Sequence, residues 1–269
     1  MLLKNKNAVI YGVSDSMAGA FGRAFAKEGA SVFLTGRSLE KVEKVANEII
    51  AAGGKAEAAQ VDALNEKEIA DHLGTVVAKA GTVDISFNGI GVQDIQDIPL
   101  IDMSLEDFVR PVAIAMQTQF LTTTAAGRIM VKQGSGVILS LTATPGGIGY
   151  PLVGGFGPAC CAIEGFSRGL ATELGPHGVR VINIRSAGSP DSRPFRDALA
   201  NDPDAVHDFL TKLEDDTMLK QLPMMADIAN VALFLASDLA DKITGVTIDV
   251  TAGTTNGLNY KIPAIPFVS

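Results

Sequence analysis

Small residues follow an apolar run near the start of the chain, in a pattern that can bind the phosphates of a nucleotide. Residues 8–11 are apolar and indicate a buried strand, and a helix is expected to begin at Met17. A strand, a tight turn and a helix N-terminus together place backbone N–H groups and the helix dipole at a pyrophosphate. An ordinary turn between a strand and a helix is the competing interpretation. The nucleotide interpretation predicts contacts from Gly12, Ser14, Ser16, Met17 and Ala18.

The end of the next apolar run indicates which nicotinamide nucleotide is preferred. Residues 31–35 form a predicted strand, and Gly36, Arg37 and Ser38 follow it. A site for NAD(H) usually has an acid here, which accepts hydrogen bonds from the ribose diol. A guanidinium and a hydroxyl suit the 2′-phosphate of NADP(H) instead. We therefore expect NADP(H) rather than NAD(H), with Arg37 and Ser38 as ligands.

Two observations oppose this cofactor assignment. Arg37 is also a reasonable solvated residue at the start of a helix. Asp15 lies in the first turn, where its carboxylate would repel a phosphate. From the residues alone, both NADP(H) binding at Arg37 and a merely solvated Arg37 stay open.

Short apolar runs alternate with longer amphipathic runs along the chain. The predicted strands are 8–11, 31–35, 56–61, 83–87, 136–141, 179–184 and 246–250. The predicted helices are 17–28, 39–52, 66–80, 105–132, 158–174 and 228–236. This spacing implies right-handed crossovers and a parallel sheet covered on both faces. We predict an α/β protein with one doubly wound, Rossmann-type domain over residues 1–269 and about seven parallel strands.

One stretch does not fit the alternation. Residues 189–223 are acidic and contain prolines, and we interpret them as an irregular, mobile lid over the substrate site.

Composition excludes several classes of protein. The 269 residues are 47% hydrophobic and 19% charged, which argues against disorder. The formal net charge of -8 argues against a nucleic-acid partner. No stretch is long and apolar enough to span a membrane, and no signal peptide is recognised. Two adjacent cysteines, Cys160 and Cys161, cannot readily form a disulfide and suggest a reducing compartment. We expect a cytoplasmic protein with a small-molecule substrate and no bound metal.

Further motifs resemble those of the short-chain dehydrogenases/reductases over nearly the whole chain. Residues 88–91 read Asn-Gly-Ile-Gly where the family has Asn-Asn-Ala-Gly, and residues 173–181 nearly repeat a family segment. Residues 186–188 match the loop that contacts the nicotinamide, and the spacing of the first turn is similar to the enoyl-ACP reductase branch. The resemblance implies these further cofactor ligands: Asp62, Ala63, Asn88, Gly89, Ser186, Gly188 and Ser192.

The resemblance also locates the family's four catalytic residues, and this sequence differs at each of them. The family's Tyr falls on Phe156, its Lys on Cys160, its Ser on Ala143 and its Asn on Ala115. A Tyr four residues before a Lys lies on the same helix face, where the ammonium lowers the pKa of the phenol. Phe156 has no proton to donate, and a thiol is mostly neutral near pH 7. The resemblance therefore implies that the family's proton relay is absent.

Two nearby residues could replace part of that relay. Tyr150 lies on the loop after the fifth predicted strand, from which its hydroxyl could point inward. Thr142 could donate a hydrogen bond to a substrate oxygen. A packing tyrosine and a threonine bonded to backbone are the respective alternatives. We name Tyr150 and Thr142 as candidate catalytic residues.

Three functions stay open from these residues. The first is an NADP(H)-dependent oxidoreductase whose acceptor needs little acid catalysis, such as an iminium, an activated enone or a quinone-like ring. The second is a non-catalytic NADP(H)-binding subunit or sensor, paired with an active relative in a hetero-oligomer. The third is non-redox chemistry, such as that of a lyase. The resemblance implies a homodimer or homotetramer built on the 105–132 and 158–174 helices and the last strand.

Overall fold

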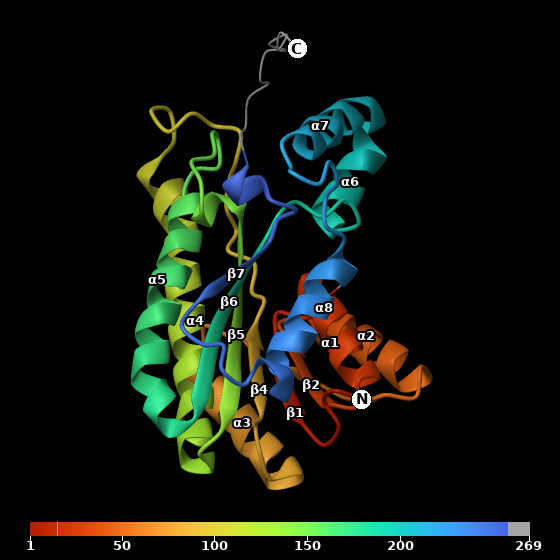
Figure 1. The fold of residues 1–269 in the computed structure, drawn as a ribbon, viewed down its shortest axis with the longest axis vertical. Helices are drawn as coiled ribbons and strands as arrows, with labels where there is room; N and C mark the ends of the chain where they lie inside the picture. The colour runs from red at the N-terminus through yellow and green to blue at the C-terminus, as the bar shows by residue number, and fades with distance from the viewer. Residues whose placement is uncertain (15, 258–269) are drawn as a thin grey trace, which may run out of the picture.

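Seven parallel strands form one sheet within residues 1–14 and 16–257, the part of the chain that the computed structural model describes (Figure 1). The strands lie in the order β3-β2-β1-β4-β5-β6-β7. Their bounds are β1 (Asn7–Tyr11), β2 (Ser31–Gly36), β3 (Lys55–Gln60), β4 (Ile85–Asn88), β5 (Gly136–Ala143), β6 (Val179–Ser186) and β7 (Thr247–Val250). This confirms the predicted doubly wound, Rossmann-type sheet. The order reverses between β1 and β4, and ligands of such sheets bind where the order reverses.

Helices cover both faces of the sheet (Figure 1). One face carries α1 (Met17–Lys27), α2 (Leu39–Ala51) and α8 (Met225–Ala236). The other carries α3 (Glu66–Ala80), α4 (Leu105–Gln133) and α5 (Phe156–Leu174). Successive strand residues point to opposite faces, so Leu139 packs with the first group and Ile138 with the second. Burial on both faces explains why the strands read as apolar runs.

The start of α4 shows how local residues set a helix boundary. Ser104 precedes the helix, and its Oγ accepts a 3.1 Å hydrogen bond from the Asp107 backbone N–H. Such a cap satisfies one of the N–H groups that lack a partner within the helix. Pro111 follows in the second turn, close enough to the start for the helix to continue to Gln133. The sequence prediction of one long helix here is confirmed.

Residues 189–223 are not irregular, contrary to the sequence prediction. They contain α6 (Arg193–Asn201) and α7 (Pro203–Asp215), which pack on each other beyond the carboxyl ends of the strands (Figure 1). The rings of Phe195 and Phe209 stack between them at 6.3 Å. Pro203 is the first residue of α7, a position where its missing N–H costs nothing. Short amphipathic helices are hidden in the sequence by the surrounding acidic and proline residues.

Two strands and one helix extend further toward the substrate side than predicted. β5 and β6 each continue for two residues, so that Ala143 and Ser186 are paired at their ends. α5 begins at Phe156, two residues earlier than predicted. These extensions place Ala143, Ser186 and Phe156 at the edge of the sheet where the ligand site is expected.

Candidate nucleotide and active site

The turns that follow β1 and β4 are in direct contact. Gly12 has a φ of +80°, and a Cβ there would lie 2.7 Å from the Gly89 carbonyl oxygen. Only glycine combines that conformation with that close approach. Gly89 is constrained as well, because a Cβ there would lie 2.9 Å from the Cβ of the buried Ala18. The structure therefore brings Gly12, Ala18 and Gly89 together at the point where the strand order reverses.

The turn before α1 leads directly into the N-terminus of that helix. The backbone N–H of Ser16 donates a 2.8 Å hydrogen bond to the Ser14 carbonyl, and Met17 is the first residue of the helix. The helix N-terminus points its unpaired N–H groups toward the carboxyl edge of the sheet, where an anion would be stabilised. Asp15, which we expected to oppose a phosphate, lies outside the described residues.

The end of β2 carries no acidic side chain, and its backbone is tightly packed at Gly36. Gly36 is buried, and a Cβ there would lie 3.0 Å from both the Val13 carbonyl oxygen and Val42 Cγ2. Arg37 and Ser38 follow it and are exposed. Ser38 precedes α2, and its hydroxyl makes no capping hydrogen bond. The guanidinium of Arg37 and the hydroxyl of Ser38 are therefore available to a ligand above β2.

Hydrogen bonds fix the turns after β3 and β4. Asp62 is half-buried, and its Oδ1 accepts a 3.0 Å bond from the Leu64 N–H, while Ala63 beside it is buried. Asn88 is buried, and its Oδ1 accepts a 3.0 Å bond from the Ile90 N–H. These carboxylate and amide groups shape the backbone of the turns.

The loop after β6 lies beside the end of β5. The Ser186 hydroxyl donates a 3.3 Å hydrogen bond to the Thr142 carbonyl. A Cβ on Gly188 would lie 2.9 Å from the Phe195 ring. Ser192 precedes α6, and its backbone N–H donates to the Ser189 carbonyl at 2.9 Å. The Ser189 hydroxyl was not singled out from the sequence, yet it is buried and has no hydrogen-bond partner among the described residues. An unpaired buried hydroxyl is costly, and a bound ligand would satisfy it.

The residues at the family's catalytic positions lie in apolar surroundings. Phe156 packs against a buried cluster that contains Ala115, Ala159 and Ile163. Cys160 is buried one helical turn after Phe156, and burial raises the pKa of its thiol to about 12. A thiol with that pKa stays protonated near neutral pH and is a weak acid. Neither Phe156 nor Ala115 can exchange a proton at all.

The two candidate catalytic residues have different surroundings. Tyr150 is half-buried and lines a cavity of about 710 Å³. Burial, and then the charge of Asp216, raises the pKa of its phenol. Its hydroxyl makes no hydrogen bond to another described residue. Thr142 is buried beneath α5, where its hydroxyl donates to Glu164 at 2.9 Å and accepts from Asn183 at 2.7 Å.

Sequence reasoning missed a buried polar network around Thr142. Glu164 of α5 forms an ion pair with Arg185 of β6 at 2.6 Å, and Arg185 also pairs with Asp249 of β7 at 2.9 Å. Asn183 extends the network to Ser140 of β5. A signal existed in the sequence, because Asn183 and Arg185 are alternate polar residues that flank the apolar Ile184 within a buried strand.

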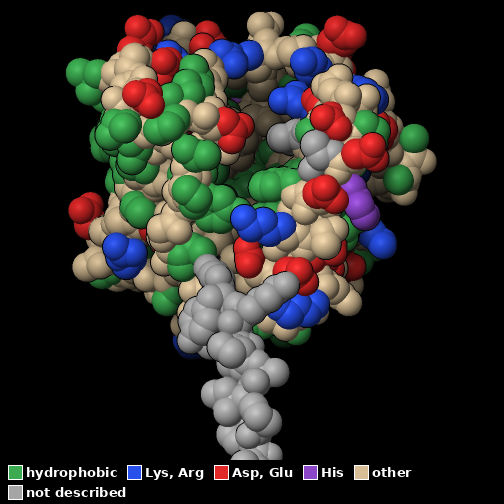
Figure 2. All heavy atoms as spheres, turned by 90° about the horizontal axis from the view of Figure 1, so that it is seen from above, with side chains coloured by type: hydrophobic (Ala, Val, Ile, Leu, Met, Phe, Trp, Pro, Cys, Tyr) green, Lys and Arg blue, Asp and Glu red, His purple; other side chains and the backbone are tan. Residues whose placement is uncertain are grey.

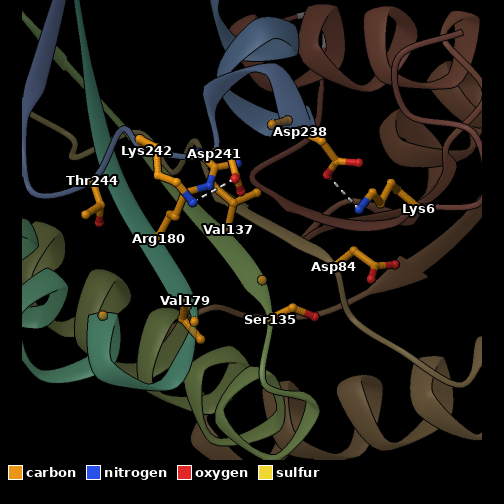
Figure 3. A pocket seen from close by; sticks show the side chains of 14 residues that line it. Lys6, Asp84, Ser135, Val137, Val179, Arg180, Asp238, Asp241, Lys242 and Thr244 are labelled. Atoms are coloured by element: carbon orange, nitrogen blue, oxygen red, sulfur yellow. Dashed lines mark hydrogen bonds and ion pairs between the residues drawn. The ribbon is translucent and has the colours of Figure 1, made fainter.

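Figure 2 shows the face above the carboxyl ends of the strands, which is hollowed near its centre. A separate cavity of about 350 Å³ lies at the opposite, amino ends of the strands (Figure 3). Its charged side chains are engaged with the protein: Lys6 pairs with Asp238 at 3.1 Å, Lys242 pairs with Asp241 at 2.9 Å, and Arg180 donates to the Ser237 carbonyl. We therefore assign the functional site to the carboxyl ends.

Among the described residues, none of the helices has the length and apolar character needed to cross a bilayer.

Comparisons with known proteins match nearly the whole chain. Residues 12–255 match the family model described as Enoyl-(Acyl carrier protein) reductase. An uncharacterized oxidoreductase from Mycobacterium tuberculosis is 30% identical over 97% of both chains. A 3-oxoacyl-[acyl-carrier-protein] reductase from a Synechocystis species is 29% identical over 91% of this chain and 95% of its own. The crystal structure of a putative short-chain alcohol dehydrogenase from Sinorhizobium meliloti is 25% identical, with a TM-score of 0.83 over 95% of this chain and 98% of its own.

Proposed function

Because the chain belongs to the short-chain dehydrogenase/reductase family, we propose that it is an NADP(H)-dependent oxidoreductase whose acceptor needs little acid catalysis. Suitable acceptors are an iminium, an activated enone or a quinone-like ring. The observation that carries this proposal is the apolar packing of Phe156 and Ala115 together with the raised pKa of Cys160. Hydride delivery to a plain ketone builds an alkoxide, which needs a proton donor in the transition state.

Several features of the site fit a bound nicotinamide nucleotide. The turns at Gly12 and Gly89 are in direct contact beside the N-terminus of α1, where a pyrophosphate would bind. The buried Ser189 hydroxyl has no partner among the described residues. Asp62, Ala63 and Asn88 would line the adenosine side, and Ser186, Gly188 and Ser192 the nicotinamide side. When bound, the nucleotide supplies a hydride or accepts one.

Preference for NADP(H) follows from the end of β2. Gly36 provides no carboxylate to accept hydrogen bonds from the ribose diol of NAD(H), and it lies in a tightly packed turn. Arg37 and Ser38 are exposed beside it, where they would bind a 2′-phosphate.

In this reaction the chain's own residues would exclude water and contact the acceptor. The apolar cluster around Phe156 excludes water from the substrate, which protects the reacting centre from side reactions. Tyr150 is the phenol that can reach the acceptor, either as a hydrogen-bond donor or as a packing surface. Reduction of an iminium needs no proton, because hydride addition to the cationic C=N carbon gives a neutral amine.

Steady-state NADPH oxidation against a panel of acceptors tests this proposal. We expect turnover with iminium, activated enone or quinone-like acceptors, and slower turnover with simple ketones. Faster reduction of plain ketones would contradict it.

A non-catalytic NADP(H)-binding subunit or sensor is the second candidate. The apolar cluster that contains Ala115 and Phe156 favours it, because that cluster contains no polar group to act on a substrate. Tight NADPH binding without turnover on any acceptor would support this candidate. Robust turnover by the purified homo-oligomer would exclude it.

We also propose that the chain forms a homodimer or homotetramer through α4, α5 and β7. Phe120 of α4 is 53% exposed, and its ring lies 6.4 Å from that of the partly buried Phe166 on α5. Light scattering coupled to gel filtration measures the assembly, and a monomer at micromolar concentration would contradict the proposal.

A further inference from the structure

A buried ion pair beneath α5 contacts the turn that leads to Tyr150. The Glu164 carboxylate accepts hydrogen bonds from Arg185 Nε at 3.0 Å and from Arg185 Nη2 at 2.6 Å. The side chains of Glu164 and Arg185 are only 6% and 13% exposed. Two parallel hydrogen bonds between charged groups fix both the distance and the relative orientation of the partners.

Both partners are also bonded to the sheet. Thr142 of β5 donates to Glu164 Oε1 at 2.9 Å. Arg185 Nη1 donates to both carboxylate oxygens of Asp249 on β7, at 2.9 and 3.1 Å. The pair therefore links α5 to β5, β6 and β7, so its position is set by three neighbouring strands and not by the helix alone.

The turn at Gly146 and Gly147 lies directly against this pair. A Cβ on Gly146 would clash with Glu164 Oε1, and a Cβ on Gly147 would lie 2.6 Å from Arg185 Nη1. The turn is closed by hydrogen bonds from the N–H groups of Gly147 and Ile148 to the Thr144 carbonyl. Because no space separates the turn from the pair, a shift of either charged side chain must shift the turn.

Stability alone is a poor explanation for such a pair. Removing two charges from water costs free energy that their attraction barely repays, and apolar replacements of similar size are often as stable. What a buried pair does supply is one defined geometry. Here that geometry is set one helical turn after Cys160 and beside Ala143, at two of the positions where the family has catalytic residues.

We propose that Glu164 and Arg185 are positioning residues, which fix the turn at 144–147 and through it the hydroxyl of Tyr150. The inference rests on the proposed function, in which Tyr150 faces the acceptor. Neither charged group contacts the acceptor, so both act through the turn.

Amide hydrogen exchange of the full chain tests the structural half of the proposal. In Glu164→Gln, the amides of residues 146–150 should exchange at least tenfold faster, while those of the turn after β1 stay unchanged. Glu48→Gln is the matched control, because it breaks the exposed Arg23–Glu48 pair of 2.8 Å and should leave residues 146–150 unchanged. Unchanged exchange at 146–150 in Glu164→Gln would overturn the proposal. This measurement needs no turnover, so its result is independent of the proposed reaction.

An apolar double variant separates positioning from folding. Glu164→Leu combined with Arg185→Met removes both charges at similar volume, and it should still unfold cooperatively. We expect the same tenfold faster exchange at 146–150 in this folded protein. Slow exchange there would show that packing, and not the ion pair, fixes the turn.

A double-mutant cycle tests the link to Tyr150. With an activated enone as the acceptor, whose carbonyl oxygen can accept a hydrogen bond from Tyr150, we expect kcat to fall at least tenfold in Glu164→Gln and in Tyr150→Phe. It should fall no further in the combined variant, with the KM for NADPH changed less than twofold. Losses that multiply would show independent action and overturn the proposal. Normal NADPH binding without turnover in the unmodified protein would instead be a failure of the proposed function, and the exchange result would then decide the positioning claim.

Discussion

The hydroxyl of Thr142 donates a hydrogen bond to the buried carboxylate of Glu164, with 2.9 Å between their oxygen atoms. The same hydroxyl accepts a bond from Asn183 Nδ2 at 2.7 Å. Its single proton is therefore committed to a carboxylate inside the protein. A substrate oxygen would have to displace Glu164 to receive it. The hydroxyl of Tyr150 makes no hydrogen bond to another described residue, so a substrate oxygen would have no such competitor there.

Thr142→Val should destabilise the protein by about 1–3 kcal/mol. In this buried site the Glu164 carboxylate loses a hydrogen-bond donor, and the Asn183 amide loses the oxygen that accepts its hydrogen bond. Urea denaturation measures this loss. Thr142→Ser keeps the hydroxyl and should recover most of it. Thr124→Val removes an exposed hydroxyl on α4 that bonds the Phe120 carbonyl at 2.6 Å, and it should cost less than about 0.5 kcal/mol. Equal stability of Thr142→Val and the unmodified protein would contradict the network as described.

Gly12→Ala should weaken NADPH binding at least tenfold. An alanine at Gly12 combines a φ of +80° with a Cβ 2.7 Å from the Gly89 carbonyl oxygen, so the two turns must move apart. Gly53→Ala is the control, because Gly53 has a φ of +85° but no atom within 4 Å of an added Cβ. That variant carries the backbone strain, about 1 kcal/mol, without the clash. Calorimetric titration distinguishes them, and equal NADPH affinity in both variants would argue against a nucleotide at this turn.

Arg37→Ala should weaken NADPH binding about 10- to 150-fold and leave NADH binding unchanged, because a hydrogen bond to a charged group contributes about 1.5–3 kcal/mol. The loss should shrink as salt is added, since the contact is exposed. Lys41→Ala removes another exposed cation, on α2, and should have little effect. Equal losses for NADPH and NADH would contradict a 2′-phosphate contact.

Cys160 should resist alkylation in the folded protein, while Cys161 is modified. Burial raises the pKa of Cys160 from 9.0 to about 12, whereas Cys161 is exposed. Iodoacetamide at pH 8 followed by peptide mass spectrometry measures this labelling, with both cysteines labelled in denaturant as the control.

The native state holds the thiol proton of Cys160 more tightly than the unfolded state. Its contribution to stability is therefore present below pH 9 and is lost between pH 9 and about 12. Rapid labelling of Cys160 at pH 8 would contradict its burial.

Much of the fold could be predicted from the sequence because the strands are buried on both faces. Val9 and Ile10 point to opposite faces and are both fully buried, so β1 reads as an apolar run. Gly12 could be singled out because a tight turn between a buried strand and a helix often requires a residue that can adopt a positive φ. The helices α6 and α7 were missed because residues 189–223 are acidic and contain prolines, which obscures amphipathic patterns only 9 and 13 residues long.

The ion pair of Glu164 and Arg185 could not be predicted, for a different reason. The two residues are separated in sequence by a helix end, a turn and most of a strand. Whether they meet depends on how α5 is rotated over β6. Polar residues at 183 and 185 within a largely buried strand indicated that some partner must exist, but not which one. Pairings of this kind are properties of packing and not of local pattern.

The most direct test of the proposed chemistry compares two acceptors with the same carbon skeleton: a permanently cationic N-methyl iminium and the corresponding ketone. The quantity to measure is kcat/KM for NADPH oxidation between pH 6 and 9, after the rate without enzyme is subtracted. The proposal predicts at least a hundredfold preference for the iminium and a flat pH profile for it, because no group of the protein must donate a proton. A ketone reduced as fast as the iminium, with a rate that falls as a single acid loses its proton, would contradict it.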